Sequence, residues 1–153
     1  MPEDVDVERR VRARPETVFA YLVEPEKFRR WQGVEAELDP RPGGSFRVCM
    51  TGRSRAVVRG EYLVVDPPRR IVFTWGFEGD ALLPGARDVP VGSSTVEITL
   101  TPEDDATIVR VRHTGLPSET ARSFHSFGWS VTVDRLVIAA EGGDPGPYPF
   151  ADQ

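Results

Sequence analysis

One long apolar segment near the C-terminus constrains the fold of this chain more than any other feature. Residues 125–140 read "HSFGWSVTVDRLVIAA", with apolar side chains recurring at helical spacing. Ser118 is a suitable N-cap for such a helix, and the "EGG" at 141–143 is a suitable end. The apolar positions occupy a wide arc, which indicates that the helix is covered on more than one side. We therefore predict a long helix packed against a larger apolar surface.

The segments before this helix have a period of two, which predicts antiparallel strands with one dry face. The predicted strands are 5–12, 34–39, 45–50, 55–66, 70–77, 94–100 and 107–114. Short helices, 15–23 and 25–33, begin at Pro15 and Pro25 after the first strand, because proline fits the first turn of a helix. Strands followed by a helix indicate an α+β fold, in which only the long helix is large enough to cover the dry face.

Length and composition limit the class of protein. The 153 residues fit one domain, 1–153, with a core over 5–140 and an irregular Gly/Pro-rich tail over 141–153. No apolar run approaches the roughly 20 residues that span a bilayer, and no signal peptide is evident. We therefore expect a cytoplasmic location and no membrane insertion. The formal charge of −5 argues against binding of nucleic acid.

Five segments carry a resemblance to a known family: "ARPETVFAYLVEPEKFRRW", "PGGSFRV", "GEYLVVDPPRRIVFTW", "STVEITL…ATIVRVRHTGLP" and "FHSFGW". With these five segments in this order, the chain resembles the START-like (SRPBCC) superfamily. More narrowly, it resembles the branch related to the activator of the heat-shock protein 90 ATPase. The resemblance implies a helix-grip fold. In that fold a seven-stranded antiparallel curved sheet wraps around a long C-terminal helix, with two short helices after the first strand. It also implies a cavity for an apolar or amphipathic ligand between sheet and helix.

Gly128 is the most informative residue of the long helix, because a glycine there costs about 1 kcal/mol relative to alanine. Two interpretations stay open. In the first, Gly128 allows a strand or a bulky side chain such as Trp75 to approach closely. In the second, a column of small residues that includes Gly128 and Thr132 leaves a void for a ligand.

Aromatic, apolar and polar residues expected to face the interior form the candidate ligand site. They are Tyr62, Phe73, Trp75, Val109, Val111, His113, His125, Gly128 and Thr132. The two histidines are expected near one another, either as structural residues bonded to backbone or water, or as a paired general acid and base. The single cysteine, Cys49, is expected to be an inert thiol. We predict no catalytic residue, no metal site and no cofactor.

A second apolar flank of the long helix needs a cover of its own. It comprises Phe124, Phe127, Val131 and Ile138. The candidate covers are the tail at 148–150, the loop 78–92 with Leu82 and Leu83, and a second copy of the chain. A homodimer through Phe127, Val131 or this loop is therefore one hypothesis.

The leading functional hypothesis is non-catalytic binding of a small hydrophobic molecule between sheet and helix. The first alternative is an interaction module of the heat-shock protein 90 ATPase activator type, which predicts a small cavity and an exposed apolar patch. The second is an enzyme like the polyketide cyclases and dehydratases, which predicts polar groups converging in the cavity.

Overall fold

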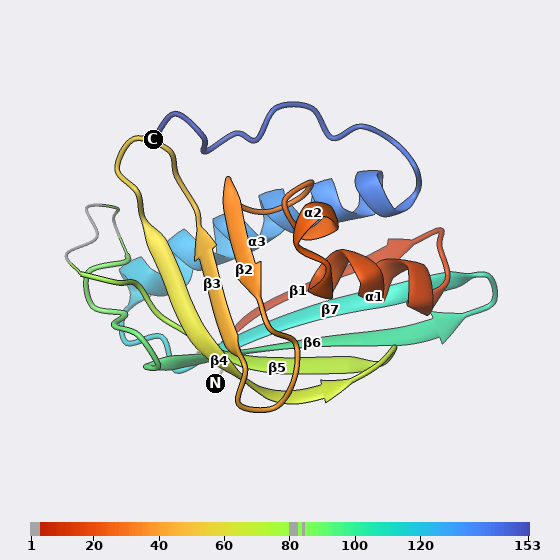
Figure 1. Ribbon diagram of the computed structural model, residues 1–153, viewed down its shortest axis with the longest axis horizontal. Helices are drawn as coiled ribbons and strands as arrows, with labels where there is room; N and C mark the ends of the chain where they lie inside the picture. Colours follow the sequence, from red (N-terminus) through yellow and green to blue (C-terminus); the bar gives the residue numbers. More distant parts are fainter. Residues whose placement is uncertain (1–3, 80–82, 84) are drawn as a thin grey trace.

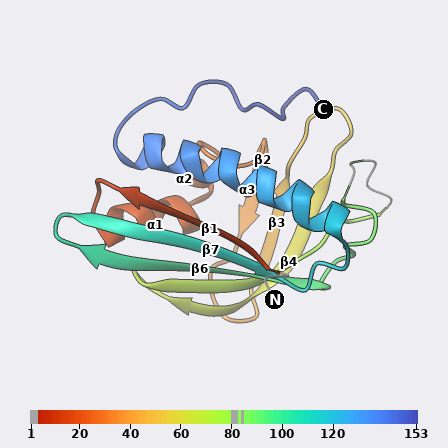
Figure 2. The same cartoon turned by 180° about the vertical axis from the view of Figure 1, so that it is seen from behind.

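The centre of the molecule is a seven-stranded antiparallel sheet (Figure 1). The computed structural model describes residues 4–79, 83 and 85–153. Its elements are β1 (Val5–Val11), α1 (Pro15–Val23), α2 (Pro25–Phe28), β2 (Glu35–Leu38), β3 (Ser45–Cys49), β4 (Val57–Asp66), β5 (Arg70–Trp75), β6 (Ser94–Glu103), β7 (Ala106–Thr114) and α3 (Glu119–Ala140). The strand order is β1-β7-β6-β5-β4-β3-β2. Figures 1 and 2 show the sheet curling around one side of α3, which confirms the predicted α+β helix-grip fold.

Alternation along the strands separates a buried face from an exposed face. The register pairs Val96 of β6 with His113 of β7, and Ile98 with Val111, and all four side chains are buried. Arg110, at an intervening position of β7, is exposed. The buried face is the one that α3 covers.

Helix α3 begins where the sequence predicts. The Ser118 side chain accepts a hydrogen bond from the backbone N–H of Ala121 at 3.1 Å. One side of the helix is buried through Trp129, Val133, Leu136 and Ala140. Glu119 and Asp134 are exposed. Within the described part of the chain, no helix is long and apolar enough to cross a membrane.

The two short helices close one end of the fold. Pro15 and Pro25 stand in the first turns of α1 and α2, where a missing N–H leaves no hydrogen bond unmade. Trp31, which follows α2, is fully buried, and its indole N–H donates to the carbonyl of Tyr21 at 2.8 Å. This hydrogen bond ties the segment after α2 to α1.

Three predicted boundaries are wrong by a few residues. Strand β6 runs to Glu103 because its hairpin pairing with β7 continues past residue 100. Strand β5 ends at Trp75, where its pairing with β6 stops at Ser94, and the loop that follows lies against Gly76. Helix α2 ends at Phe28, and turns then lead to Gly33, whose φ of +84° favours glycine.

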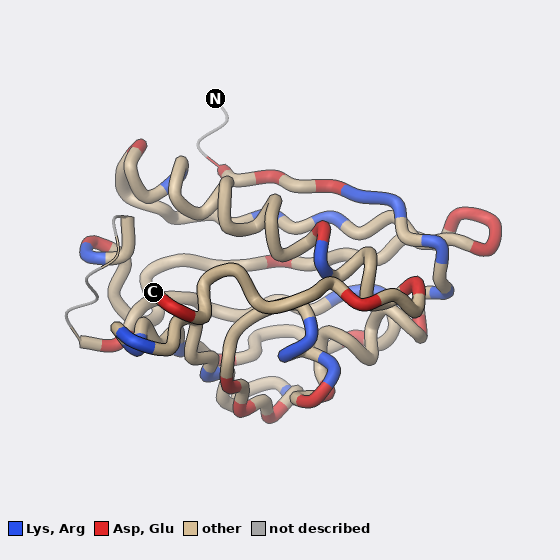
Figure 3. Tube along the Cα trace, turned by 90° about the horizontal axis from the view of Figure 1, so that it is seen from above, with Lys and Arg blue, Asp and Glu red and all other residues tan. Residues whose placement is uncertain are grey.

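The tail after α3, residues 141–153, forms turns and irregular structure and is tied to the helix. The side chain of Arg135 is mostly buried, and its guanidinium donates to three successive tail carbonyls, those of Pro145, Gly146 and Pro147. The same guanidinium lies over the ring of Tyr148, 5.5 Å from its centroid. Figure 3 shows the tail running back alongside α3 toward the C-terminus, and its residues 145–151 carry no charge. Arg135 therefore anchors the near half of the tail.

The far half of the tail is bound by the loop between β3 and β4. The backbone N–H of Gly52 donates to the carbonyl of Ala151 at 2.9 Å. The N–H groups of Arg53 and Ser54 both donate to the carbonyl of Gln153, also at 2.9 Å. The C-terminus accordingly lies beside this loop (Figure 1).

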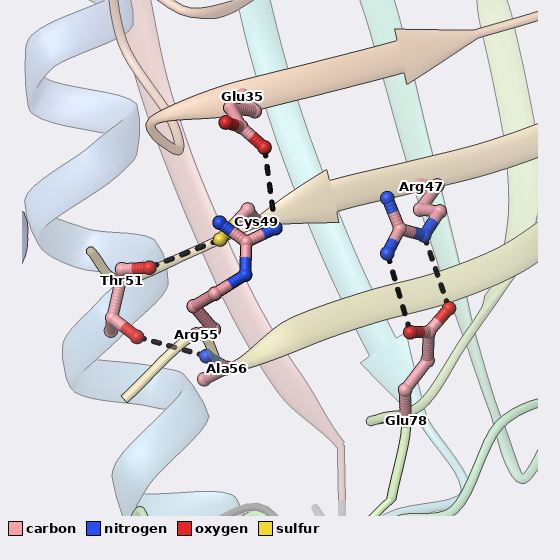
Figure 4. Close-up of polar contacts among 7 residues, drawn as sticks. All are labelled: Glu35, Arg47, Cys49, Thr51, Arg55, Ala56 and Glu78. Carbon is pink, nitrogen blue, oxygen red and sulfur yellow. Dashed lines mark hydrogen bonds and ion pairs between the residues drawn. The ribbon is translucent and has the colours of Figure 1, made fainter. Parts of the chain in front are cut away.

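Side-chain hydrogen bonds stabilise the loop that holds the tail (Figure 4). The hydroxyl of Thr51 accepts from the backbone N–H of Ala56 at 2.9 Å. The thiol of Cys49 is buried and donates to the carbonyl of Thr51 at 3.0 Å. Cys49 thus has a structural partner, in line with the inert thiol expected from the sequence.

Candidate functional site

A small pocket lies where α3, the sheet and the tail meet. Its volume is about 40 Å³. The lining residues are Gln32, Met50, Trp75, Phe124, His125, Gly128, Trp129, Thr132 and Phe150. Apolar and aromatic side chains predominate among them, and none of the nine is an Asp, Glu, Lys or Arg. The pocket therefore suits an uncharged guest.

The structure brings four of the predicted site residues together and leaves five elsewhere. Trp75, His125, Gly128 and Thr132 line the pocket, whereas Tyr62, Phe73, Val109, Val111 and His113 are buried away from it. The reason is that side chains fill the hollow of the sheet. The ring of Phe46 stacks on that of Phe73, with centroids 4.2 Å apart. The space is confined to one end of α3.

Tyr62, one of the predicted site residues, lies in the packed part of the core. Its ring makes edge contacts with Phe46 and Phe73, both at 5.9 Å between centroids. Its hydroxyl has no hydrogen-bond partner within the described part of the chain. Burial raises the pKa of the Tyr62 phenol, so this group stays neutral at physiological pH.

Gly128 borders open space. Among the described residues, a Cβ built on Gly128 meets no atom within 4 Å, apart from its two chain neighbours and the backbone of its own helix. The close-packing interpretation is therefore wrong, since neither Trp75 nor a strand occupies the position a side chain would take. The hydroxyl of Thr132, one turn later, donates to the Gly128 carbonyl at 3.0 Å. The missing side chain of Gly128 is part of what makes the pocket.

The two histidines lie together, as predicted, with ring centroids 4.9 Å apart. Each accepts a hydrogen bond from a tryptophan. The indole N–H of Trp129 donates to Nδ1 of His113 at 3.0 Å, and that of Trp75 donates to Nε2 of His125 at 3.2 Å. Because an indole nitrogen can only donate, each accepting nitrogen must be unprotonated.

This requirement determines the tautomer of both rings. His113 must carry its proton on Nε2, which donates to the hydroxyl of Ser94 at 2.9 Å. The Ser94 hydroxyl in turn donates to the carbonyl of Trp75 at 2.8 Å. His125 must carry its proton on Nδ1, which donates to the carbonyl of Ala121 at 2.8 Å. All four ring nitrogens thus have a partner.

Both imidazoles are held neutral. Burial lowers the pKa of His113 well below its ordinary value, and the neighbouring His125 lowers it further. Burial also lowers the pKa of His125, against smaller opposing effects of the Ala121 carbonyl and of Asp88. With every ring nitrogen engaged, this geometry favours a structural role for the pair over general acid–base catalysis. The network joins the sheet to α3 behind the pocket.

Gln32 is a lining residue that the sequence analysis missed. It is 2% exposed, and its Oε1 has no hydrogen-bond partner among the residues that the structure describes. An unpaired buried amide oxygen is unusual in a protein interior and needs an explanation. The sequence predicts a helix over 25–33, but the structure places Gln32 in the turns after α2, so helical spacing gave no signal that it lines a pocket.

The loop 78–92 covers part of the second apolar flank of α3. A side chain at Gly85 would collide with the ring of Phe124, so the loop lies directly against that residue. Leu83 is half-buried and packs on the core. Leu82, the other leucine expected in this contact, lies outside the described residues.

The tail covers the next part of this flank, but incompletely. The ring of Phe150 lies 6.4 Å from that of Phe127, centroid to centroid, and also lines the pocket. Phe127 nevertheless remains 64% exposed, and Ile138 is 43% exposed. Phe150 therefore serves as the outer wall of the pocket, while Phe127 stays open to solvent.

Several solved structures are similar to this chain in fold. The AHSA1-like protein RHE_CH02687 from Rhizobium etli is 40% identical, with all of this chain and 92% of that chain covered, at a TM-score of 0.70. CalU16 from Micromonospora echinospora is 27% identical, with 94% and 69% covered and a TM-score of 0.73. PFC0360w, an HSP90 activator from Plasmodium falciparum, is 18% identical, with 87% and 92% covered at a TM-score of 0.67, and supports the fold alone.

A family model gives the most direct assignment. No curated protein sequence matches the chain. The model described as "Activator of Hsp90 ATPase homolog 1-like protein" matches residues 12–141 of the 153. That match runs from the end of β1 to the end of α3, and so includes nearly the whole sheet. The chain therefore belongs to the AHSA1 family, on the START-like branch that its sequence motifs indicate.

Proposed function

We propose that this chain binds a small, uncharged, predominantly apolar molecule in the pocket between α3, the sheet and the C-terminal tail. The observation that carries the proposal is the open space beside Gly128, where a helix gives up stability for a residue that packs against nothing. The walls around this space are aromatic and apolar, as in most small-molecule sites.

The size of the pocket implies that its cover moves when the ligand enters. A volume of about 40 Å³ is well below the roughly 150 Å³ of an apolar cavity that holds benzene. Phe150 is the outer wall, and it belongs to a tail held by Arg135 and a few backbone hydrogen bonds. Displacement of Phe150 is the simplest way to admit six or more heavy atoms.

Burial of apolar surface is sufficient for measurable affinity. Each buried CH₂ contributes about 0.8 kcal/mol, and a millimolar Kd requires about 4 kcal/mol. A guest with the apolar surface of roughly five CH₂ groups therefore reaches this range. Toluene is a suitable probe, because it is uncharged, compact and slightly larger than that minimum.

The direct test is titration of toluene into ¹⁵N-labelled protein, followed through the indole N–H signals of Trp75 and Trp129. We expect saturable shifts in the wild type and in Gly128→Ala, which adds one methyl group in open space. Gly128→Leu should stay folded and lose the shifts, because its side chain fills the pocket. Absence of binding in the wild type and in Phe150→Ala, which removes the outer wall, would overturn the proposal.

A catalytic function has less support. An enzyme of the polyketide cyclase or dehydratase type needs polar groups free to exchange protons with the substrate. The pocket's histidine, His125, uses both ring nitrogens in buried hydrogen bonds. The hydroxyl of Thr132 is likewise committed to the backbone.

A second candidate function, an interaction module, rests on the exposure of Phe127 and on the small size of the pocket. Here we propose a second copy of this chain as the partner, covering Phe127 and Val131. A dimer that dissociates in Phe127→Ser, while toluene binding is unchanged, would show that the dimer contact is separate from the pocket.

We also propose that the protein lies in the cytoplasm, and cell fractionation tests this location.

A further inference from the structure

We infer that the ligand of the pocket carries a neutral O–H or N–H donor, and that the side-chain amide of Gln32 recognises it. This inference rests on the proposed function and narrows its ligand class. Among the nine lining residues, Gln32 combines near-complete burial with a polar atom that lacks a partner in the described part of the chain.

The other polar groups at the pocket are already engaged. The indoles of Trp75 and Trp129 donate to the two histidines. His125 is saturated by Trp75 and Ala121. The Thr132 hydroxyl donates to the carbonyl of Gly128. The carbonyl oxygen of Gln32 is therefore the group with capacity to accept a hydrogen bond from a guest.

The charge of the lining selects a neutral ligand. No lining residue is acidic or basic, and His125 is held neutral by burial. A charged group brought into this setting would lose its hydration without gaining a counterion, which is strongly unfavourable. A hydroxyl or amide N–H is hydrated far less strongly, and one hydrogen bond to Oε1 of Gln32 compensates for its burial.

In the unliganded protein, the unpaired and buried Oε1 of Gln32 should lower the free energy of unfolding. Replacement of an unpaired buried polar group by an apolar one of similar shape is neutral or stabilising. Gln32→Met should therefore raise Tm, by about 2–4 °C. A glutamine with a purely structural role would give the opposite sign, because its loss would break hydrogen bonds that hold the core.

Three probes of similar size test the inference in the wild-type protein: phenol, toluene and anisole. Phenol offers a donor, toluene replaces the hydroxyl by a methyl group, and anisole keeps the oxygen but cannot donate. We expect phenol to bind more tightly than toluene, because toluene leaves Oε1 of Gln32 unpaired, and anisole to bind about tenfold more weakly than phenol for the same reason. These comparisons need no variant and do not depend on how a substitution folds.

A variant of Gln32 tests whether this residue causes the preference for phenol. In Gln32→Met the affinity for phenol should fall about tenfold or more, while that for toluene stays within about twofold. Toluene binding with no preference for phenol, or a phenol preference that survives in Gln32→Met, would overturn the inference and leave the proposed function intact. Failure of both probes to bind, in the wild type and in Phe150→Ala, would overturn the proposed function itself.

Discussion

The indole N–H of Trp75 on β5 donates to Nε2 of His125 on α3 at 3.2 Å, so one buried hydrogen bond joins the sheet to the helix that it grips. The indole cannot accept, so this contact exists only while His125 is unprotonated at Nε2. His113 accepts from Trp129 in the same way. The stability of the sheet–helix contact is thereby tied to the protonation of two rings.

The first prediction is that the free energy of unfolding falls as the pH drops below about 6.5, the ordinary pKa of histidine. Both histidines have a lowered pKa in the folded state. The unfolded chain therefore binds more protons in this range, and stability present above pH 6.5 is lost on acidification. Urea unfolding at several pH values between 5 and 7.5 measures the slope.

These are the only two histidines in the chain, so the slope can be assigned to them. In His125→Gln it should decrease by up to about 1.4 kcal/mol per pH unit, the contribution of one titrating group. A wild-type stability that is constant from pH 7.5 to 5 would contradict the lowered pKa of the two histidines in the folded state.

The second prediction concerns stability at Gly128. Gly128→Ala should raise the free energy of unfolding by about 1 kcal/mol, because alanine is the better helix former and its methyl group enters open space. Chemical denaturation measures this directly. A loss of stability in Gly128→Ala would mean that the position is closely packed, which would remove the main support for the pocket.

The third prediction concerns the anchor of the tail. Arg135→Met removes three donors to tail carbonyls. Hydrogen exchange at the backbone amides of Gly52, Arg53 and Ser54 should then accelerate, by about tenfold or more if the lost contacts exceed 1.4 kcal/mol. Arg41→Met is the matched control, since the Arg41 side chain pairs with the nearby Asp39 on the surface. Equal exchange in both variants would show that the tail holds without Arg135.

The fourth prediction concerns the exposed aromatic ring of Phe127. Phe127→Ser should change the free energy of unfolding by no more than about 0.5 kcal/mol, as for other exposed positions. If a second copy covers this ring, light scattering should show a dimer in the wild type and a monomer in the variant. Leu63→Ser, at another exposed apolar residue, should leave the dimer intact. A wild type that is monomeric at all concentrations would exclude this contact.

Much of the fold could be predicted from the sequence, because its signals are local. Strand alternation, the prolines that start α1 and α2, and the Ser118 cap each depend on a few neighbouring residues. Where contacts between distant parts of the chain determine the end of an element, the sequence predicts that end less accurately. Strand β5 stops before Gly76, where residues 90–91 of the loop that follows lie against the glycine, and no local pattern reports this contact.

The candidate site was predicted only in part, for a related reason. The helical column containing His125, Gly128 and Thr132 is readable from spacing, and these residues do line the pocket. Gln32 and Phe150 come from irregular segments, whose path is determined by contacts with α3 rather than by their own periodicity. Residues deeper in the sheet, such as Val111, were assigned to the cavity because strand parity cannot tell a filled hollow from an empty one.

Native mass spectrometry of the protein purified from its own cells, with Gly128→Leu purified in parallel, tests the central claim most directly. Our account predicts a bound molecule of low mass on the wild-type chain, released on mild activation, and a bare mass for Gly128→Leu. A bare mass for both proteins, or the same adduct on both, would contradict a ligand site beside Gly128.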